Sequence, residues 1–331
     1  MKILKGFITF AILLGAYAFF QRNINMPVYD YFISRHVATY KHMNTFGERN
    51  SVDYIIIGDS TGLHTIQPTK LKVTADNLCL SGASTQDSYY ALIRLDLTKV
   101  KKGIILASSF YAASHYDKHL WERFISTGFY SWSDLFEIYN ESMLTHTYPS
   151  SEMSYFSYLW RIATSKLFLY PEAVKSFFQF PYNFVKKNKM TLYLNRQSEG
   201  ELGFIPHPKN FHLSPEQFIE PYNDFYSKPF VINETDSYYL NKIVNYSKTK
   251  NLKLYILSPI LADRALGKDV SKFINGFHAF FNSLAAKEPT VKYVIMPTSD
   301  HAADFFDFNH LSKIGADNLA SKISFVLDKL N

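Results

Sequence analysis

Short apolar runs alternate with longer amphipathic segments along much of the chain. Continuous apolar runs that end in small or polar residues are typical of strands buried on both faces of a sheet. Five such strands are predicted, at residues 54–57, 77–80, 102–108, 252–259 and 291–297. Because these strands alternate with helix-like segments, the pattern predicts an α/β fold with a parallel sheet covered on both faces.

Helix signals separate several of these strands. Ser84 and Thr85 are good N-cap residues, so a helix is expected to begin there and to continue to Leu97. Two more helices are predicted at about residues 270–286 and 311–330. The stretch between the first two strands is predicted to be a loop with a short helical turn at its end, residues 70–73.

Residues 110–240 differ in character from the rest of the chain. They are rich in Tyr, Phe, Trp and Pro and hold few strand patterns. We interpret them as a large, mostly helical insertion or cap within one α/β domain of residues 51–331. Trp121, Trp132 and Trp160 lie in this insertion and are interpreted as core anchors, with stacking on sugars as the alternative.

Residues 1–22 predict an association with a membrane. Lys2 and Lys5 precede an apolar run at 6–20, a pattern typical of a signal peptide or an N-terminal membrane anchor. Because both lysines precede the run, the rest of the chain is expected on the periplasmic or extracytoplasmic side of the membrane. It begins with a connector at 23–50. A buried helix of a soluble protein is the alternative interpretation.

Composition narrows the expected partners. The 331 residues are enough for a large core, and the 17% aromatic content fits either a thick core or a surface that meets carbohydrate or membrane. The net charge of +6 is spread without a long basic block, so nucleic acid is not an expected partner. Cys79 is the single cysteine, so an intrachain disulfide is excluded. We interpret Cys79 as a buried apolar residue.

Candidate chemistry begins where the first predicted strand ends, at Gly58-Asp59-Ser60. Ligands of open α/β sheets bind at the carboxyl ends of the strands, so Ser60 is in the place of a nucleophile. A serine hydroxyl becomes a good nucleophile only when a base takes its proton. A polar turn that merely ends a strand is the alternative, because a tripeptide alone is a weak motif.

A base for this serine is predicted near the C-terminus, where Asp307 and His310 precede the last helix. Their spacing lets the carboxylate bind one imidazole nitrogen while the other nitrogen faces outward, as in a Ser-His-Asp triad. A metal site is the competing explanation, because acidic residues and histidines recur from 300 to 310. Their spacing matches no familiar metal site and leaves Ser60 unused, so we predict no metal and no cofactor.

Three motifs together resemble the SGNH, or GDSL-like, hydrolase family. Gly-Asp-Ser at 58–60 is similar to the family's nucleophile block, residues 77–82 to its glycine block, and Asp-x-x-His at 307–310 to its last block. The resemblance covers about residues 51–110 and 250–331. It implies a flavodoxin-like three-layer α/β/α sandwich. It also implies the site roles: Ser60 as nucleophile, His310 as base, Asp307 as its orienting acid, and the N–H groups of Ser60 and Gly82 as oxyanion donors.

The chain departs from the family pattern after the third strand. The family has Gly-x-Asn there, and the Asn donates to the oxyanion, whereas this chain has Ala-Ser-Ser-Phe at 107–110. Ser108 or Ser109 is the candidate substitute. Losing one such donor costs on the order of a hundredfold or more in turnover.

Within the family, the chain resembles an exported, membrane-anchored branch. The shared features are the N-terminal apolar segment, Ile-x-Pro at 66–68 and Asn-Leu-x-Leu-Ser-Gly-Ala-Ser at 77–84. The resemblance implies an envelope glycan or acyl ester as substrate and a membrane-embedded acyltransferase as partner. The predicted function is O-acetylation of an envelope or secreted polysaccharide through a Ser60 acyl-enzyme. Two alternatives stay open: a carbohydrate or lipid esterase or deacetylase, and an inactive SGNH-fold glycan-binding protein.

Overall fold

A computed structural model describes residues 31–109, 124–125, 127–167, 201–205, 227–261, 268–296, 299, 304–305 and 310–328. The chain divides into two compact units, which are considered separately. The α/β unit comprises Ala38–Trp121 and Leu194–Asn331, and the second unit comprises Met1–Val37 and Glu122–Tyr193. The predicted N-terminal signal or anchor at 1–22 lies outside the described residues. Among the residues that are described, no helix is long and apolar enough to span a bilayer.

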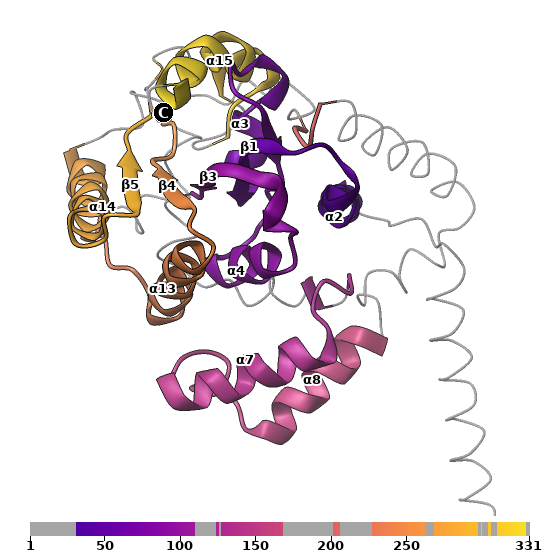
Figure 1. Ribbon diagram of the computed structural model, residues 1–331. Helices are drawn as coiled ribbons and strands as arrows, with labels where there is room; N and C mark the ends of the chain where they lie inside the picture. The colour runs from indigo at the N-terminus through magenta and orange to yellow at the C-terminus, as the bar shows by residue number, and fades with distance from the viewer. Residues whose placement is uncertain are drawn as a thin grey trace, which may run out of the picture. The chain divides into compact units, whose positions relative to one another are not determined.

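The described part of the α/β unit contains one five-stranded sheet, in which every neighbouring pair of strands is parallel. The strand order is β2-β1-β3-β4-β5. Figure 1 labels β1, β3, β4 and β5, which follow one another in this order. The strands are β1 (Val52–Gly58), β2 (Ala75–Asn77), β3 (Val100–Ala107), β4 (Lys253–Leu257) and β5 (Val291–Val294). The predicted α/β fold with a parallel sheet is therefore confirmed.

Buried β-branched residues form the middle of the sheet. Ile55, Ile56 and Ile57 of β1 are fully buried, because this strand has neighbours on both edges and helices on both faces. The second strand is shorter than predicted and begins earlier. Leu78 and Leu80 follow it and still donate backbone N–H groups to carbonyl oxygens of β1, at 2.7 and 2.9 Å. The predicted strand at 77–80 is thus largely an irregular continuation of β2.

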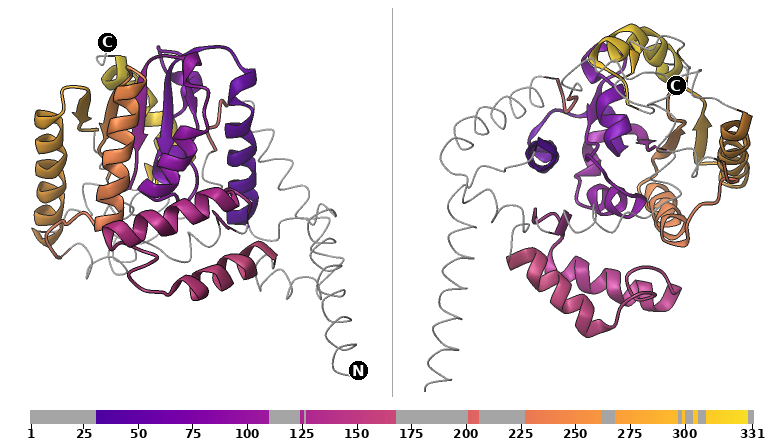
Figure 2. Two further views of the ribbon diagram at one scale, coloured as in Figure 1. Left: turned by 60° about the horizontal axis from the view of Figure 1, so that its bottom comes forward. Right: turned by 180° about the vertical axis from the view of Figure 1, so that it is seen from behind.

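Helices cover both faces of the sheet. The helices of the α/β unit are α3 (Ser60–Thr65), α4 (Thr85–Ile93), α13 (Glu234–Thr249), α14 (Lys268–Lys287) and α15 (Lys313–Asp328), with short 3-10 turns η1 (Phe46–Glu48), η2 (Pro68–Lys70) and η3 (Leu97–Lys99). α3 and α15 lie on one face and α4 and α13 on the other (Figures 1 and 2). The prediction of a loop after β1 is wrong, because α3 begins directly at Ser60.

The predicted start of α4 is confirmed. Ser84 is its N-cap, and Ser84 and Asp87 form a capping box in which each side chain binds the other's backbone N–H. The helix ends at Ile93 rather than at the predicted Leu97, where η3 begins instead.

The described part of the second unit includes α7 (Trp132–Thr145) and α8 (Tyr155–Leu167). They pack through aromatic side chains: the rings of Tyr139 and Tyr158 lie 4.7 Å apart, and Tyr158 donates to the carbonyl of Leu135 at 2.6 Å. Trp132 and Trp160 are 46% and 74% exposed, so their interpretation as core anchors is wrong. Trp121 lies outside the described residues. Within residues 110–240, the insertion prediction remains untested.

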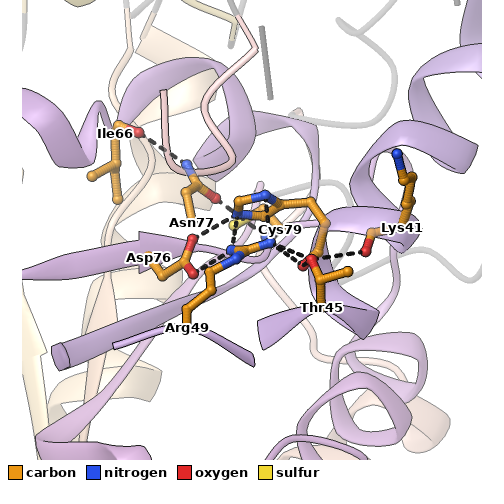
Figure 3. Close-up of polar contacts among 8 residues, drawn as sticks. Lys41, Thr45, Arg49, Ile66, Asp76, Asn77 and Cys79 are labelled. Carbon is orange, nitrogen blue, oxygen red and sulfur yellow. Dashed lines mark hydrogen bonds and ion pairs between the residues drawn. The ribbon is translucent and has the colours of Figure 1, made fainter. Parts of the chain in front are cut away.

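A polar cluster joins helix α2 (Tyr31–Asn44) to the edge strand β2. His42 donates from Nε2 to Asp76 at 2.7 Å, and Arg49 donates to the same carboxylate at 2.5 Å. Arg49 also donates to Thr45 at 2.7 Å (Figure 3). We call His42, Thr45, Arg49 and Asp76 the Arg49 cluster. Asp76 is almost fully buried, and each of its carboxylate oxygens has a cationic or N–H partner.

Candidate active site

The turn from β1 into α3 fixes the position of Ser60. Gly58 has φ of +140°, and a Cβ there would collide with the carbonyl oxygen of Ala107. Only glycine therefore suits this position. Asp59 then caps α3, because its carboxylate accepts the N–H of Thr61 at 2.8 Å. Ser60, the first residue of the helix, is half-buried at the carboxyl end of β1.

Asp59 also joins two loops at this edge of the sheet. Its second carboxylate oxygen accepts the backbone N–H of Ser109 at 2.8 Å. Its own N–H donates to the carbonyl of Ala107 at 3.2 Å. Asp59 is only 3% exposed, so its role is to hold the loop after β3 against the start of α3.

Asn77 holds the other end of α3. Its side-chain amide donates to the carbonyl of Gly62 at 3.0 Å. It also donates to the carbonyl of Ile66 at 2.9 Å, and its oxygen accepts the N–H of Cys79 (Figure 3). A Cβ at Gly62 would lie 2.6 Å from Cys79 Sγ, so the short helix packs very closely on the sheet. Burial raises the pKa of the Cys79 thiol, and the predicted apolar role of this cysteine is confirmed by its complete burial.

His310 reaches Ser60 from the other end of the chain. Its Nε2 lies 2.7 Å from Ser60 Oγ, across 250 residues of sequence. This is hydrogen-bond distance for a hydroxyl that donates to an imidazole nitrogen. Both side chains are half-buried. The structure therefore brings together the predicted nucleophile and the predicted base. Asp307, the predicted orienting acid, lies outside the described residues.

Asp304 organises the loop that carries His310. Its carboxylate accepts from Ser299 Oγ at 2.5 Å and from Asn318 Nδ2 at 2.8 Å. Its carbonyl accepts the N–H of Ser312 at 2.8 Å, immediately before α15. Asp304 is 2% exposed, and its oxygens hold the loop together and tie it to α15. Within the described residues, no group of three or more His, Cys, Asp or Glu side chains is arranged to hold a metal ion.

Among the predicted oxyanion donors, Ser60 is the first residue of α3, and the others lie on the loops after β2 and β3. Gly82 has φ of +74° and is half-buried, just before the N-cap of α4. The N–H of Ser109 is bound to Asp59, so this group is committed to holding the loop. Ser108 is half-buried and lines a small pocket of about 10 Å³ with Thr61 and Thr65 of α3. The roles of Gly82 and Ser108 as donors stay predictions.

A buried acid lies behind the Gly82 loop. Asp236, near the start of α13, accepts the N–H of Thr85 at the start of α4, at 3.0 Å. Burial, reinforced by the nearby charge of Asp87, raises the pKa of Asp236 to about 7, although hydrogen bonds from Asn233 and Thr85 oppose the shift. The start of α4 is thus held by a carboxyl group that titrates near neutrality. No sequence motif pointed to this residue.

His64 is a second residue that the motifs did not indicate. Its ring lies 5.7 Å from the ring of His310, centroid to centroid. The signal was present in the sequence, because His64 follows Ser60 by four residues and shares its face once α3 is recognised as a helix.

The chain matches no protein-family model and no curated protein.

Proposed function

We propose that this protein is a serine acyltransferase of the SGNH type that transfers an acyl group, which we take to be acetyl, to an envelope or secreted polysaccharide. The observation that carries the proposal is the 2.7 Å approach of Ser60 Oγ to His310 Nε2. The strand order supports a protein of the SGNH type. The doubly wound sheets of flavodoxin-like proteins have the same order and bind ligands at the carboxyl ends of their strands.

Each half of the proposed reaction uses two proton transfers through His310. His310 takes the Ser60 proton as Oγ attacks the acyl carbon of the donor ester, and a tetrahedral oxyanion forms. The backbone N–H groups of Ser60 and Gly82 donate to this oxyanion. The bond to the donor alcohol then breaks, and that alcohol leaves with the proton from His310. Ser60 now carries the acyl group as an ester.

The second half of the reaction repeats these steps with a new alcohol. A polysaccharide hydroxyl gives its proton to His310 and attacks the acyl-enzyme. The bond from the acyl carbon to Ser60 breaks, and the proton returns to Oγ. Asp307 orients His310 throughout. In this proposal the N-terminal segment holds the enzyme at the outer face of a membrane, beside a membrane-embedded acyltransferase that supplies the acyl group.

Trapping of the acyl-enzyme tests the proposal. The full-length protein in detergent is mixed with 4-nitrophenyl acetate, quenched in acid and measured by intact mass. One acetyl adduct is expected on the parent and none on Ser60→Ala. Ser51→Ala is the matched control, because Ser51 is an exposed serine just before β1, and it should keep the adduct. A folded parent without an adduct, or an adduct that persists in Ser60→Ala, would contradict the proposal.

The fate of the acetyl group separates transfer from hydrolysis. Added polysaccharide acceptor should speed the loss of the adduct and should itself become acetylated. If the adduct decays only to acetate at a rate that acceptors do not change, the esterase or deacetylase alternative is the correct one. This second arm uses the same samples and depends on the adduct found in the first.

A further inference from the structure

His64 packs against the proposed catalytic base. The rings of His64 and His310 meet edge to face, with centroids 5.7 Å apart and an angle of 73° between their planes. Ser60 and His64 are four residues apart on α3, so both side chains project from one side of this helix. His310 therefore meets the serine hydroxyl through Nε2 and also packs against the ring of His64.

The ring of His64 is itself firmly held. It is 1% exposed, and its Nδ1 lies 2.5 Å from the carbonyl oxygen of Ile205. A carbonyl oxygen only accepts, so the proton of this hydrogen bond belongs to Nδ1 of His64. This bond fixes the plane of the ring, because the backbone of α3 fixes one end of the side chain and Ile205 fixes the other.

Ile205 is a fixed anchor because the segment Glu201–Ile205 is bound to the edge of the sheet. The carbonyl of Leu202 accepts the N–H of Asn77 at 2.9 Å. Gly203 has φ of +89°, and a Cβ there would collide with the carbonyl of Asn77, so the segment lies directly against β2. The carbonyl that holds His64 thus belongs to the folded α/β unit.

We propose that His64 is a positioning residue for His310. The anchored ring of His64 restricts the imidazole of His310 to the rotamer that places Nε2 beside Ser60 Oγ. His310 is half-buried, and edge-to-face ring pairs have a preferred geometry that restricts the orientation of its ring. The inference rests on the proposed function only in naming His310 as the base. Displacement of a catalytic group by about 1 Å can cost on the order of a hundredfold in rate.

The test compares His64→Ala, which removes the ring, with His64→Phe, which keeps an aromatic ring in contact with His310. The full chain is used throughout, and the rate of labelling by a fluorophosphonate is measured. His64→Ala should label at least about tenfold more slowly, and His64→Phe within about threefold of the parent. His278→Phe is the matched control, because His278 pairs with Tyr293 far along the sheet, and it should label like the parent.

A spectroscopic readout separates positioning from a general effect on folding. Histidine labelled with ¹⁵N reports the hydrogen bond of His310 Nε2, and the signal that changes in Ser60→Ala identifies it. This hydrogen-bonded signal should persist in the parent and in His64→Phe and should be lost in His64→Ala. If His64→Ala does not fold, His64→Leu takes its place, because leucine fills the space without an aromatic ring.

An unchanged His310 signal and an unchanged labelling rate in the variant without the ring would overturn the positioning role. A His64→Leu variant that labels like the parent and keeps the His310 signal would also overturn it, because filling the space without an aromatic ring would then be enough. If the parent does not label at all while the His310 signal still responds to Ser60→Ala and to His64→Ala, the positioning role stands and the proposed function fails.

Discussion

His310 and His42 belong to the same α/β unit, and each lies within 2.7 Å of a polar side chain, but their surroundings differ. His42 is 3% exposed and belongs to the Arg49 cluster, where the carboxylate of Asp76 is paired with both His42 and Arg49. His310 is half-buried and meets the hydroxyl of a serine at the carboxyl end of β1.

The comparison shows that burial and the partner, rather than the residue type, separate a histidine that holds the fold from the histidine that we propose as a base. In the Arg49 cluster, the carboxylate of Asp76 and the guanidinium of Arg49 are charged groups that bind His42. The cluster stabilises the junction of α2 and β2. Beside Ser60, the partner is a neutral hydroxyl with a proton to give, and both groups remain accessible to a substrate. Single substitutions in the two regions test this difference.

The largest expected effect is on labelling by a fluorophosphonate in His310→Ala. Without a base, the rate should fall on the order of a thousandfold or more. The free energy of unfolding should change by no more than about 1 kcal/mol, because His310 is half-buried. His42→Ala should do the opposite, with a lower unfolding free energy and an unchanged labelling rate per folded molecule. Urea unfolding measures the folded fraction of each variant. Similar losses of labelling rate in His310→Ala and His42→Ala would contradict the difference between the two histidines.

The next effect is on stability in Asp76→Ala. This change leaves Arg49 and His42 without their buried carboxylate, so the free energy of unfolding should fall by about 3 kcal/mol or more. Glu288→Ala is the matched control, because it removes the surface ion pair with Lys248, which contributes about 0–1 kcal/mol. Equal losses in urea unfolding of the two variants would show that the Arg49 cluster does not stabilise the fold.

Asp59→Ala should have a smaller effect on both the free energy of unfolding and the labelling rate, because Asp59 holds the start of α3, where Ser60 lies. Two buried backbone N–H groups, of Thr61 and Ser109, lose their acceptor, so unfolding should become easier by about 2 kcal/mol. Labelling should slow as well, since the start of α3 is loosened. Asp96→Ala removes the cap of an exposed 3-10 turn and should change neither property. A normal labelling rate in Asp59→Ala would mean that Ser60 needs no such support.

The smallest effect, taken per pH unit, is on the pH dependence of stability through Asp236. Its pKa is about 7 when folded and has the ordinary value of 3.8 when exposed, so the folded protein binds more protons between these values. Stability contributed by this group is therefore present at low pH and is lost as the pH rises through about 7, by up to about 1.4 kcal/mol per pH unit. Asp236→Asn should remove this slope in urea unfolding measured from about pH 4 to 7. An identical slope would assign the titration to other groups.

The sequence predicted the sheet and the Ser60–His310 pair because both follow from one rule. Buried parallel strands are continuous apolar runs, and the residues that follow their carboxyl ends meet at one edge of the sheet. Gly58-Asp59-Ser60 is therefore placed by local pattern alone. His310 is placed because it precedes the last helix, which packs on the same face as α3.

The parts that were missed depend on long-range contacts. α3 is six residues long and contains Gly62, so its sequence has little helix propensity, and the bonds from Asp59 and Asn77 hold it in place. The role of His64 depends on that helix. The exposure of Trp132 and Trp160 could not be inferred from aromatic content, because composition does not say which face of a helix a residue occupies.

The most direct test of the account is fluorophosphonate labelling of the full-length parent, with the modified peptide located by mass spectrometry. The account predicts a single adduct on Ser60, present in Ser51→Ala and absent from Ser60→Ala and His310→Ala. A folded parent that takes no label, or a label on any other residue, would contradict the claim that His310 activates Ser60, and would favour the inactive glycan-binding alternative in the first case.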